Sequence, residues 1–232
     1  EFGVGERSDA WNHWALFGFP KEATCLEWQK FRFICMSPTL QKLYLATVVE
    51  AGRRTALPSR VWTVGFKKGC SPLIVTDLLR KCLFLASQWQ GAPLIIGSHD
   101  VETAFDLMEH GYIHEALLGR GWPRCLADSV LRELTDVEAT ASVSGLGSTA
   151  RFAVSRGGRQ GGTETPEVWN AYLEYFLEEV IMKWEREGKG FRIDTLKPIS
   201  HIIWADNIYI LASSLREYQE MFADVTVALG RA

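Results

Sequence analysis

The segment HIIWADNIYIL, residues 201–211, consists of two short apolar runs around a polar centre. The runs His201–Trp204 and 208–211 are rich in β-branched and aromatic residues, which favour strands. The three residues between them, 205–207, have the composition of a tight turn. The segment therefore predicts a β-hairpin with Asp206 at its tip.

Helices and further strands are predicted on the N-terminal side of this hairpin, and one helix follows it. Residues 165–187 carry an apolar stripe at helical spacing that ends before Gly188, with Thr165 as the expected cap and Pro166 in the first turn. The same periodicity predicts helices at 39–49, 72–88, 101–117 and 215–229. A buried strand is expected at 92–97 and a second hairpin at 140–143 and 151–155. The sum is a mixed α+β fold.

Composition and cysteine usage narrow the class of protein. The chain has 232 residues, 47% of them hydrophobic, so it can bury an ordinary core in one domain or two small ones. It begins at Glu1 without a signal peptide, so we expect a piece of a longer protein, and its apolar runs are too short to span a membrane. Five scattered cysteines without a Cys-x-x-Cys pair argue against a disulfide framework or zinc ribbon. We expect an intracellular protein of the cytoplasm or nucleus.

The charge of the chain is slightly negative and unevenly distributed. A net charge of -3 disfavours nucleic-acid binding, because proteins that grip phosphates usually carry a basic surface. Acids gather between residues 164 and 187, whereas the first third of the chain is basic, with Arg53, Arg54, Arg60, Lys67, Lys68, Arg80 and Lys81. This pattern leaves open both a solvated surface and a phosphate-binding patch.

Two aspartates occupy positions that do not suit a residue of the hydrophobic core. Asp100 lies between a predicted strand and a predicted helix, and Asp206 lies at the hairpin tip. If that strand pairs with the hairpin in one antiparallel sheet, the two carboxylates meet at its edge. They would then hold Mg²⁺ or Mn²⁺, because such hard cations take oxygen ligands and share them with substrate phosphates. Taken singly, Asp100 also suits a helix cap and Asp206 a turn.

Five short segments of the chain carry a family resemblance. DVETAFD (100–106) and WADN (204–207) contain the two aspartates, and RQGGTETP followed by WN (159–170) lies between them. FRFI with a following Lys-Leu (31–43) and GFKKGCS (65–71) lie upstream. In this order they resemble the motifs of reverse transcriptases of non-LTR (LINE-type) retrotransposons, and they are also similar to those of group II introns.

The resemblance implies a fold and a set of metal ligands. The fold is that of a polymerase: a palm with an antiparallel sheet and packed helices, plus fingers, with the thumb missing. A fingers-like region would occupy residues 1–95 and a palm-like region residues 96–232 of one continuous domain. Asp100 and Asp206 would be catalytic and, with Asn207, would bind Mg²⁺ or Mn²⁺.

The resemblance also implies a nucleotide-binding set. Arg32 and Lys67 would hold the incoming triphosphate, as cationic donors to phosphate commonly do. Gln160 would contact nucleotide and template, and Gly161 would let the backbone come close. Phe105 would block a ribose 2′-hydroxyl and so favour deoxynucleotides. The plainer interpretations are surface charge for the two cations, a flexible loop for Gln-Gly and a core position for Phe105.

The implied function is RNA-directed DNA polymerase activity, which adds dNTPs to a DNA primer on an RNA template. Asn207, in place of the family's second hairpin aspartate, favours an alternative: a catalytically silent, decayed fragment that at most binds nucleic acid. An RNA-directed RNA polymerase is the third hypothesis, which Phe105 and the absence of a Gly-Asp-Asp hairpin disfavour. The sequence does not determine the oligomeric state.

Two weaker motifs point elsewhere. GLGSTA, residues 145–150, matches the letters of a dinucleotide-binding fingerprint, but that motif must open a helix and residues 151–155 alternate like a strand. His110 and His114 have the spacing of a shared metal site on a helix, without an obvious third ligand. Both are interpreted as ordinary structural positions.

Overall fold

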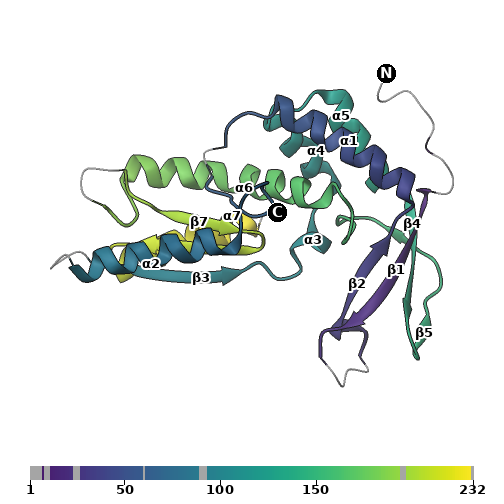
Figure 1. Cartoon of the computed structure of the whole chain (residues 1–232), viewed down its shortest axis with the longest axis horizontal. Coiled ribbons are helices and arrows are strands. Elements are labelled where there is room, and N and C mark those ends of the chain that lie inside the picture. The colour runs from purple at the N-terminus through teal and green to yellow at the C-terminus, as the bar shows by residue number, and fades with distance from the viewer. Residues whose placement is uncertain are drawn as a thin grey trace. The chain divides into compact units, whose positions relative to one another are not determined.

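The computed structural model describes residues 7, 11–22, 27–59, 61–88, 93–193 and 197–230 (Figure 1). The described residues form a mixed α and β fold with two sheets, as predicted. The strands are β1 His13–Pro20, β2 Phe31–Met36, β3 Ile95–Asp100, β4 Val137–Val143, β5 Gly147–Ser148, β6 Phe152–Val154, β7 His201–Trp204 and β8 Asn207–Ala212. The α-helices are α1 Thr39–Thr55, α2 Pro72–Gln88, α3 Ala104–Leu107, α4 His110–Gly119, α5 Arg124–Leu134, α6 Thr165–Glu187 and α7 Leu215–Leu229. None of these described helices is long and apolar enough to cross a membrane.

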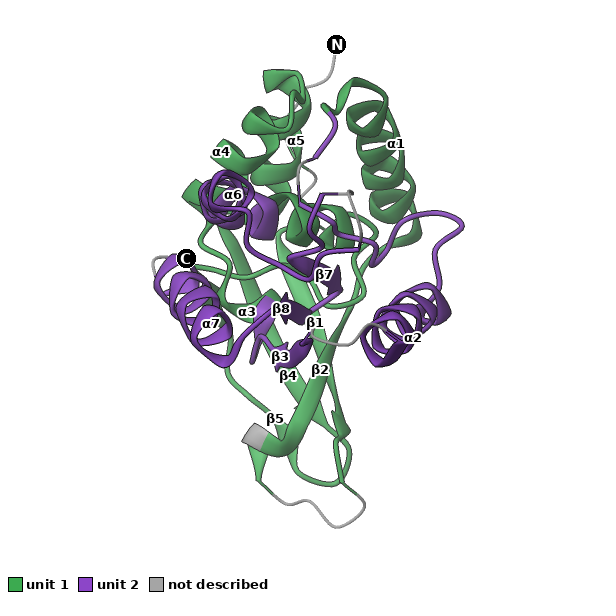
Figure 2. Ribbon diagram, turned by 90° about the vertical axis from the view of Figure 1, so that its left-hand side faces the viewer, with its two compact units in different colours: residues 1–57, 105–171 green, residues 58–104, 172–232 purple. Residues whose placement is uncertain are grey.

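The chain divides into two compact units that alternate along the sequence (Figure 2). Unit 1 comprises Glu1–Leu57 and Phe105–Ala171, and unit 2 comprises Pro58–Ala104 and Tyr172–Ala232. Compactness and function are different criteria for dividing a chain. The fingers-like and palm-like regions expected from the sequence therefore stay a prediction.

Unit 1 contains the larger sheet, in the order β2-β1-β4-β5, with β6 also paired to β4. β1 pairs antiparallel with β2 and parallel with β4, which lies far away in the sequence. Helix α5 contacts both α1 and α4. Their shared core consists of buried apolar side chains, which include Leu45, Val48, Ile113, Leu117, Val130 and Leu134. Such burial stabilises the unit by roughly 1.5–3 kcal/mol per large side chain.

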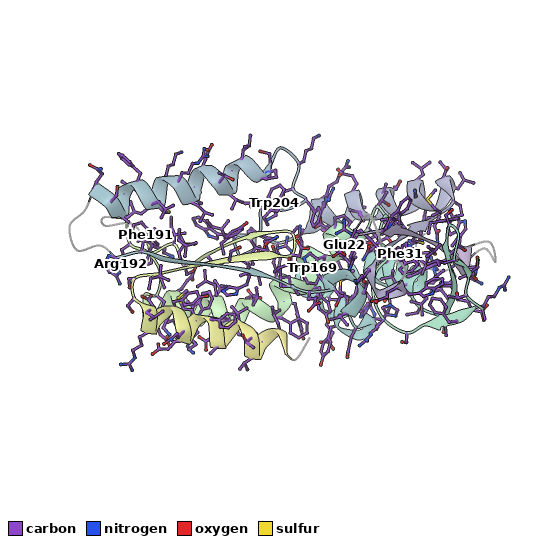
Figure 3. The ribbon with its side chains drawn as sticks, turned by 90° about the horizontal axis from the view of Figure 1, so that it is seen from below. Glu22, Phe31, Trp169, Phe191, Arg192 and Trp204 are labelled. Atoms are coloured by element: carbon purple, nitrogen blue, oxygen red, sulfur yellow. The ribbon has the colours of Figure 1, made fainter. Side chains whose placement is uncertain are left out.

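Unit 2 is built on the three-stranded antiparallel sheet β3-β8-β7. Helix α2 covers one face of this sheet, and α6 and α7 lie on the other face (Figures 1 and 2). Between α2 and the sheet lies an apolar core that contains Phe191, shown in Figure 3. Its other buried members are Val75, Cys82, Ile202 and Leu211. The central strand β8 is buried on both sides, so the apolar run noted in the sequence forms the middle of a sheet.

Several boundaries differ from the predicted ones. The helices at 72–88 and 215–229 are confirmed, whereas the first helix continues to Thr55 and the strand expected at 92–97 runs from Ile95 to Asp100. Residues 89–92 lie outside the described part of the chain. Strand β1 and helix α5 were not predicted at all. β1 depends on pairing with a distant strand, which no local pattern reveals.

The single helix expected at 101–117 is wrong, because the chain forms α3 and α4 with a break at residues 108–109. The break has a hydrogen-bonding cause. The N–H of Gly157 donates to the carbonyl of Met108 at 2.7 Å, and the N–H of Gly158 donates to the carbonyl of Phe105 at 2.8 Å. These two carbonyls therefore bond to a distant loop instead of continuing the helix.

Candidate active site

Asp100 and Asp206 lie at the same end of the sheet of unit 2. Asp100 is the last residue of β3 and stands opposite Asn207, the first residue of β8. Paired residues of antiparallel strands have Cα atoms about 4.5–5.5 Å apart. Asp206 directly precedes Asn207, and its carbonyl accepts a hydrogen bond from the N–H of Val101 at 2.9 Å. The structure thus brings together the two aspartates, whose catalytic role stays a prediction.

The turn that carries Asp206 is tighter than the sequence suggested. Trp204 pairs with Asn207, so Ala205 and Asp206 alone form the loop between β7 and β8. The placement of Asn207 within the turn was therefore wrong, because its backbone belongs to the ladder. Ala205 adopts a φ of 55° in the left-handed region, which costs a non-glycine residue roughly 1–2 kcal/mol. Such a conformation persists where the surrounding structure holds it.

Gly65 packs directly on this turn. An added Cβ at Gly65 would overlap the backbone nitrogen of Ala205. Residues 62–64 run beside β7, where the N–H of Val64 donates to the carbonyl of Ile203 at 2.8 Å. A side chain at position 65 would therefore displace the backbone of the turn. This contact explains why a glycine opens the segment GFKKGCS.

Lys67 belongs to the loop that begins at Gly65. Phe66 and Gly69 in this loop have φ angles of 61° and 82°, so the chain turns sharply on either side of Lys67. The Lys67 side chain is exposed. Because Gly65 anchors the loop on the hairpin turn, this cation belongs to the same end of unit 2 as the aspartates.

The oxygen ligands available at this sheet edge fit a magnesium or manganese ion. Asp100 is exposed, Asp206 and Asn207 are half-buried, and Nδ2 of Asn207 lies 3.5 Å from Oδ1 of Asp206. Among the described residues, no three acidic, histidine or cysteine side chains gather in one place. The protein thus offers two carboxylates and one amide oxygen. Magnesium commonly binds through one or two carboxylates and completes its shell with water and phosphates.

Gln160 and Gly161 lie in a loop of unit 1 that packs against β2. The N–H of Cys35 donates to the carbonyl of Gln160 at 2.7 Å. Gly161 has a φ of 99°, and an added Cβ there would lie 3.1 Å from a side-chain carbon of Ile34. The close backbone approach expected at Gly161 therefore occurs against a strand of the same unit. Whether a nucleotide also approaches it stays a prediction.

The side chain of Gln160 is held by Asp106. Nε2 of Gln160 donates to both carboxylate oxygens of Asp106, at 3.2 and 3.3 Å. Asp106 is exposed at the surface, and partial desolvation of its carboxylate raises its pKa, while the hydrogen bond from Gln160 and the charge of Lys21 act in the opposite direction. The Gln160 loop is thus fixed by its backbone on one side and by its side chain on the other.

A buried ion pair closes the same loop. Nε of Arg159 donates to Oε1 of Glu164 at 2.8 Å, and both side chains are 1% exposed. The guanidinium also lies over the ring of Trp14, 5.7 Å from the ring centroid. The hydroxyl of Thr165, expected to cap helix α6, donates to the carbonyl of Arg159 at 2.6 Å. The chain therefore enters α6 through a tight, internally bonded turn.

The two remaining nucleotide-site candidates belong to unit 1. Arg32 is exposed on β2, opposite Phe19 of β1. Phe105 is half-buried, and its ring meets that of the buried Trp169 edge-on at 5.7 Å. The position of Phe105 is compatible with a core role as well as with contact to a ligand.

Neither of the two weaker motifs has the local structure that its possible function would require. Residues 145–150 contain the short strand β5 and are followed by strand β6, so no helix follows the glycines. His110 Nε2 bonds to the carbonyl of Gly157 at 3.0 Å, and His114 Nε2 bonds to Asp128 at 2.7 Å. The two histidines therefore engage different groups.

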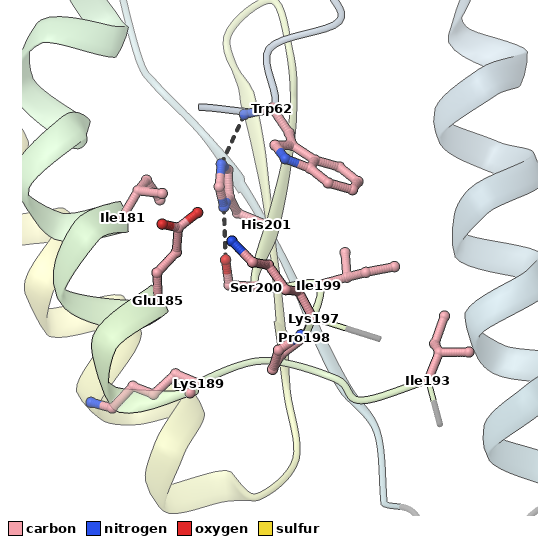
Figure 4. Close-up of a pocket in the computed structure, with 11 residues that line it drawn as sticks. Trp62, Ile181, Glu185, Lys189, Ile193, Lys197, Pro198, Ile199, Ser200 and His201 are labelled. Atoms are coloured by element: carbon pink, nitrogen blue, oxygen red, sulfur yellow. Dashed lines mark hydrogen bonds between the residues drawn. The ribbon is translucent and has the colours of Figure 1, made fainter. Parts of the chain in front are cut away.

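A cavity of about 550 Å³ lies in unit 2 at the end of β7 remote from the turn (Figure 4). His201 forms part of its wall, accepts the N–H of Trp62 at 3.0 Å and bonds through Nδ1 to Ser200 at 2.9 Å. Burial lowers the pKa of His201 to about 4. His201 is therefore neutral, and both of its ring nitrogens are hydrogen-bonded. It lies at the start of β7, whereas the turn with Asp206 follows the end of β7.

Sequence reasoning missed three contacts: those of Gly65 with the turn, Asp106 with Gln160, and Arg159 with Glu164. Gly65, Asp106 and Arg159 each lie inside a quoted motif, within two residues of a predicted site residue. A glycine or a charged residue so close to a predicted site residue was the only sequence signal that pointed to these contacts. Its partner could not be read from the sequence, because each partner depends on the fold.

No family model matches the sequence, and no curated protein sequence matches it. Solved structures do resemble it. Apo telomerase from Candida tropicalis matches with a TM-score of 0.59 and 11% identity, over 96% of this chain and 42% of that one. A second apo structure from the same organism, truncated from the C-terminal domain, matches with a TM-score of 0.57 and 12% identity, over 96% and 48%. Telomerase from Candida albicans with the TWJ fragment of telomeric RNA matches with 0.55 and 11%, over 95% and 41%.

These similarities concern the fold alone, because the identities are low. The chain spans less than half the length of the telomerase structures that it matches. Telomerase catalytic subunits are reverse-transcriptase-like. The fold of this chain is therefore similar to that of part of these telomerase structures.

Proposed function

We propose that this chain is the fingers and palm portion of an RNA-directed DNA polymerase, whose partners are an RNA template, a DNA primer and dNTPs. One observation carries the proposal: Asp100 and Asp206 lie at one end of the antiparallel sheet β3-β8-β7. The similarity of the fold to telomerase structures supports it, and so does the RNA fragment in one of them. Origin from a LINE-type element rests on the resemblance of the five sequence segments.

Each proposed site residue has a chemical task. The carboxylates of Asp100 and Asp206, with the amide oxygen of Asn207, bind Mg²⁺ or Mn²⁺. Bound metal supplies charge stabilisation for the attacking and leaving oxygens of phosphoryl transfer. Lys67 and Arg32 neutralise the triphosphate of the incoming nucleotide.

Residues of unit 1 select and orient the nucleotide in this proposal. Gln160 contacts the nucleotide and the template, and Gly161 keeps the adjacent backbone free of a side chain. Phe105 excludes a 2′-hydroxyl, so the polymerase prefers deoxynucleotides. Its edge-on contact with Trp169 supplies the rigid backing that steric exclusion requires.

A second function is favoured by Asn207. An asparagine offers a neutral ligand where a carboxylate would add a charge, so the metal site is weaker than one with three acids. The chain would then be a catalytically silent fragment that only binds nucleic acid. The two hypotheses share the fold and differ in catalysis.

A primer-extension assay distinguishes the hypotheses. The chain is incubated with a DNA primer annealed to an RNA template, Mg²⁺ or Mn²⁺, and either dNTPs or rNTPs. Extension with dNTPs supports the DNA polymerase, whereas extension with rNTPs alone indicates an RNA polymerase. Binding of the primer–template without extension, together with extension by Asn207→Asp, supports the silent fragment. If neither the unaltered protein nor Asn207→Asp extends the primer, the polymerase proposal is overturned.

A further inference from the structure

The carboxylate of Asp106 is hydrogen-bonded to Gln160, the residue that the proposed function places beside the nucleotide. Nε2 of Gln160 donates to Oδ1 and Oδ2 of Asp106, at 3.2 and 3.3 Å. An ionised carboxylate only accepts hydrogen bonds, so this contact selects one of the two orientations of the amide. The amide nitrogen faces Asp106, which leaves Oε1 of Gln160 as the atom directed away from it.

The backbones of both partners are fixed independently of this contact. On the Asp106 side, an added Cβ at Gly157 would lie 2.9 Å from the carbonyl oxygen of Asp106, so the two backbones touch. On the Gln160 side, the N–H of Cys35 holds the carbonyl of Gln160 at 2.7 Å. The bond between the side chains therefore determines the direction of the amide, while other contacts determine where the loop lies.

We infer that Asp106 is a positioning residue, which holds the amide of Gln160 in one orientation before a nucleotide binds. The inference rests on the proposed function and extends it to a residue that does not itself touch the nucleotide. Glutamine loses much side-chain entropy when it is ordered, so an amide ordered in advance loses less on binding. Asp106 therefore acts on nucleotide affinity and not on the chemical step.

The first test separates KM from kcat for dNTPs in primer extension. Asp106→Ala raises the KM for dNTPs by up to about tenfold, because the entropy of ordering the Gln160 side chain is then lost when the nucleotide binds. It leaves kcat within about twofold, because the metal ligands are untouched. Asp106→Asn keeps an acceptor oxygen, so its KM stays close to that of the unaltered protein. Glu138→Ala is the matched control, because Glu138 is an exposed acid of the same unit, 3.6 Å from Arg151.

The second test needs no activity. The side-chain amide of Gln160 is observed by NMR in protein labelled with ¹⁵N-glutamine, and its signal is assigned from its loss in Gln160→Met. The side-chain order parameter of Gln160 is high in the unaltered protein and in Asp106→Asn. It falls in Asp106→Ala and is unchanged in Glu138→Ala.

The outcomes distinguish this inference from the proposed function. An unaltered protein that extends no primer contradicts the proposed function, while the NMR experiment still tests the positioning role. An equally mobile Gln160 amide in the unaltered protein and in Asp106→Ala overturns the inference. So does an unchanged KM in Asp106→Ala alongside normal extension. A fall in kcat with constant KM would assign Asp106 a different role.

Discussion

Two pairs of charged side chains, one pair in each unit, occupy opposite environments. Arg159 and Glu164 of unit 1 are opposite charges, 1% exposed and bonded to each other at 2.8 Å. Asp100 and Asp206 of unit 2 are like charges at one sheet edge, one of them exposed and the other half-buried. The opposite charges of the first pair compensate each other, whereas the two carboxylates of the second pair repel each other unless a cation lies between them.

The difference shows how structural and functional charges can be told apart without a bound ligand. A buried opposite pair shapes the chain around it, because removal of one partner leaves an uncompensated charge. Two carboxylates at one sheet edge, one of them on a well-anchored turn, repel each other without a counter-charge, so their placement indicates a ligand. In this molecule the anchoring comes from Gly65 and the hairpin ladder. We therefore expect the first pair to govern folding and the second to govern activity.

The largest expected effect concerns the aspartates. Asp100→Asn or Asp206→Asn lowers the rate of metal-dependent primer extension on the order of a thousandfold or more, because each removes a charged metal ligand. The free energy of unfolding changes by less than about 1 kcal/mol, because neither carboxylate is buried. Extension assays and urea unfolding measure the two quantities. Glu102→Gln, an exposed acid next to the site, is the control and retains full activity.

The second-largest effect is expected on stability, when one member of the buried Arg159–Glu164 pair is removed. Arg159→Met destabilises the fold by about 3–5 kcal/mol, because Glu164 is left buried without its partner. The double variant Arg159→Met with Glu164→Leu loses less, since no charge remains buried. Urea denaturation measures both, with the exposed Arg151→Met as a control that changes stability by at most about 1 kcal/mol. Equal losses in the single and double variants would contradict the account of the pair.

The smallest of the three effects tests a buried ionisable group of unit 2. The pKa of His201 is lowered from 6.5 to about 4 by burial, so the unfolded chain takes up a proton at a higher pH than the folded one. The stability contributed by neutral His201 is complete above pH 6.5 and is lost as the pH falls towards 4. The shift corresponds to about 3 kcal/mol. In His201→Gln, the dependence of unfolding free energy on pH should flatten in this window, and an unaltered pH slope would contradict the assignment.

Much of unit 2 could be predicted from the sequence. The apolar runs of β7 and β8 are short and local, and α2 and α7 have clear amphipathic periods with defined ends. The meeting of Asp100 and Asp206 followed from one assumption, that the strand before Asp100 pairs with the hairpin, which the register confirms. Local signals were sufficient for the β7–β8 hairpin, which pairs with itself, but not for the pairing of β3 with β8.

Unit 1 was less predictable for a physical reason. Its sheet joins β1 to β4 across most of the unit's sequence, and the break between α3 and α4 depends on carbonyls that bond to Gly157 and Gly158. Neither long-range pairing nor a distant hydrogen bond leaves a periodic pattern. The bond between Asp106 and Gln160 is of the same kind. The roles of Arg32, Lys67, Phe105, Gln160 and Gly161 toward a nucleotide stay predictions.

The most direct test of the metal site is a crystal structure of the protein grown with Mn²⁺ and examined by anomalous scattering. We expect an anomalous peak at the end of the β3-β8-β7 sheet, with oxygens of Asp100 and Asp206 roughly 2.1 Å from the ion. An anomalous map without a peak there, with the two carboxylates well separated or paired with basic side chains, would contradict it.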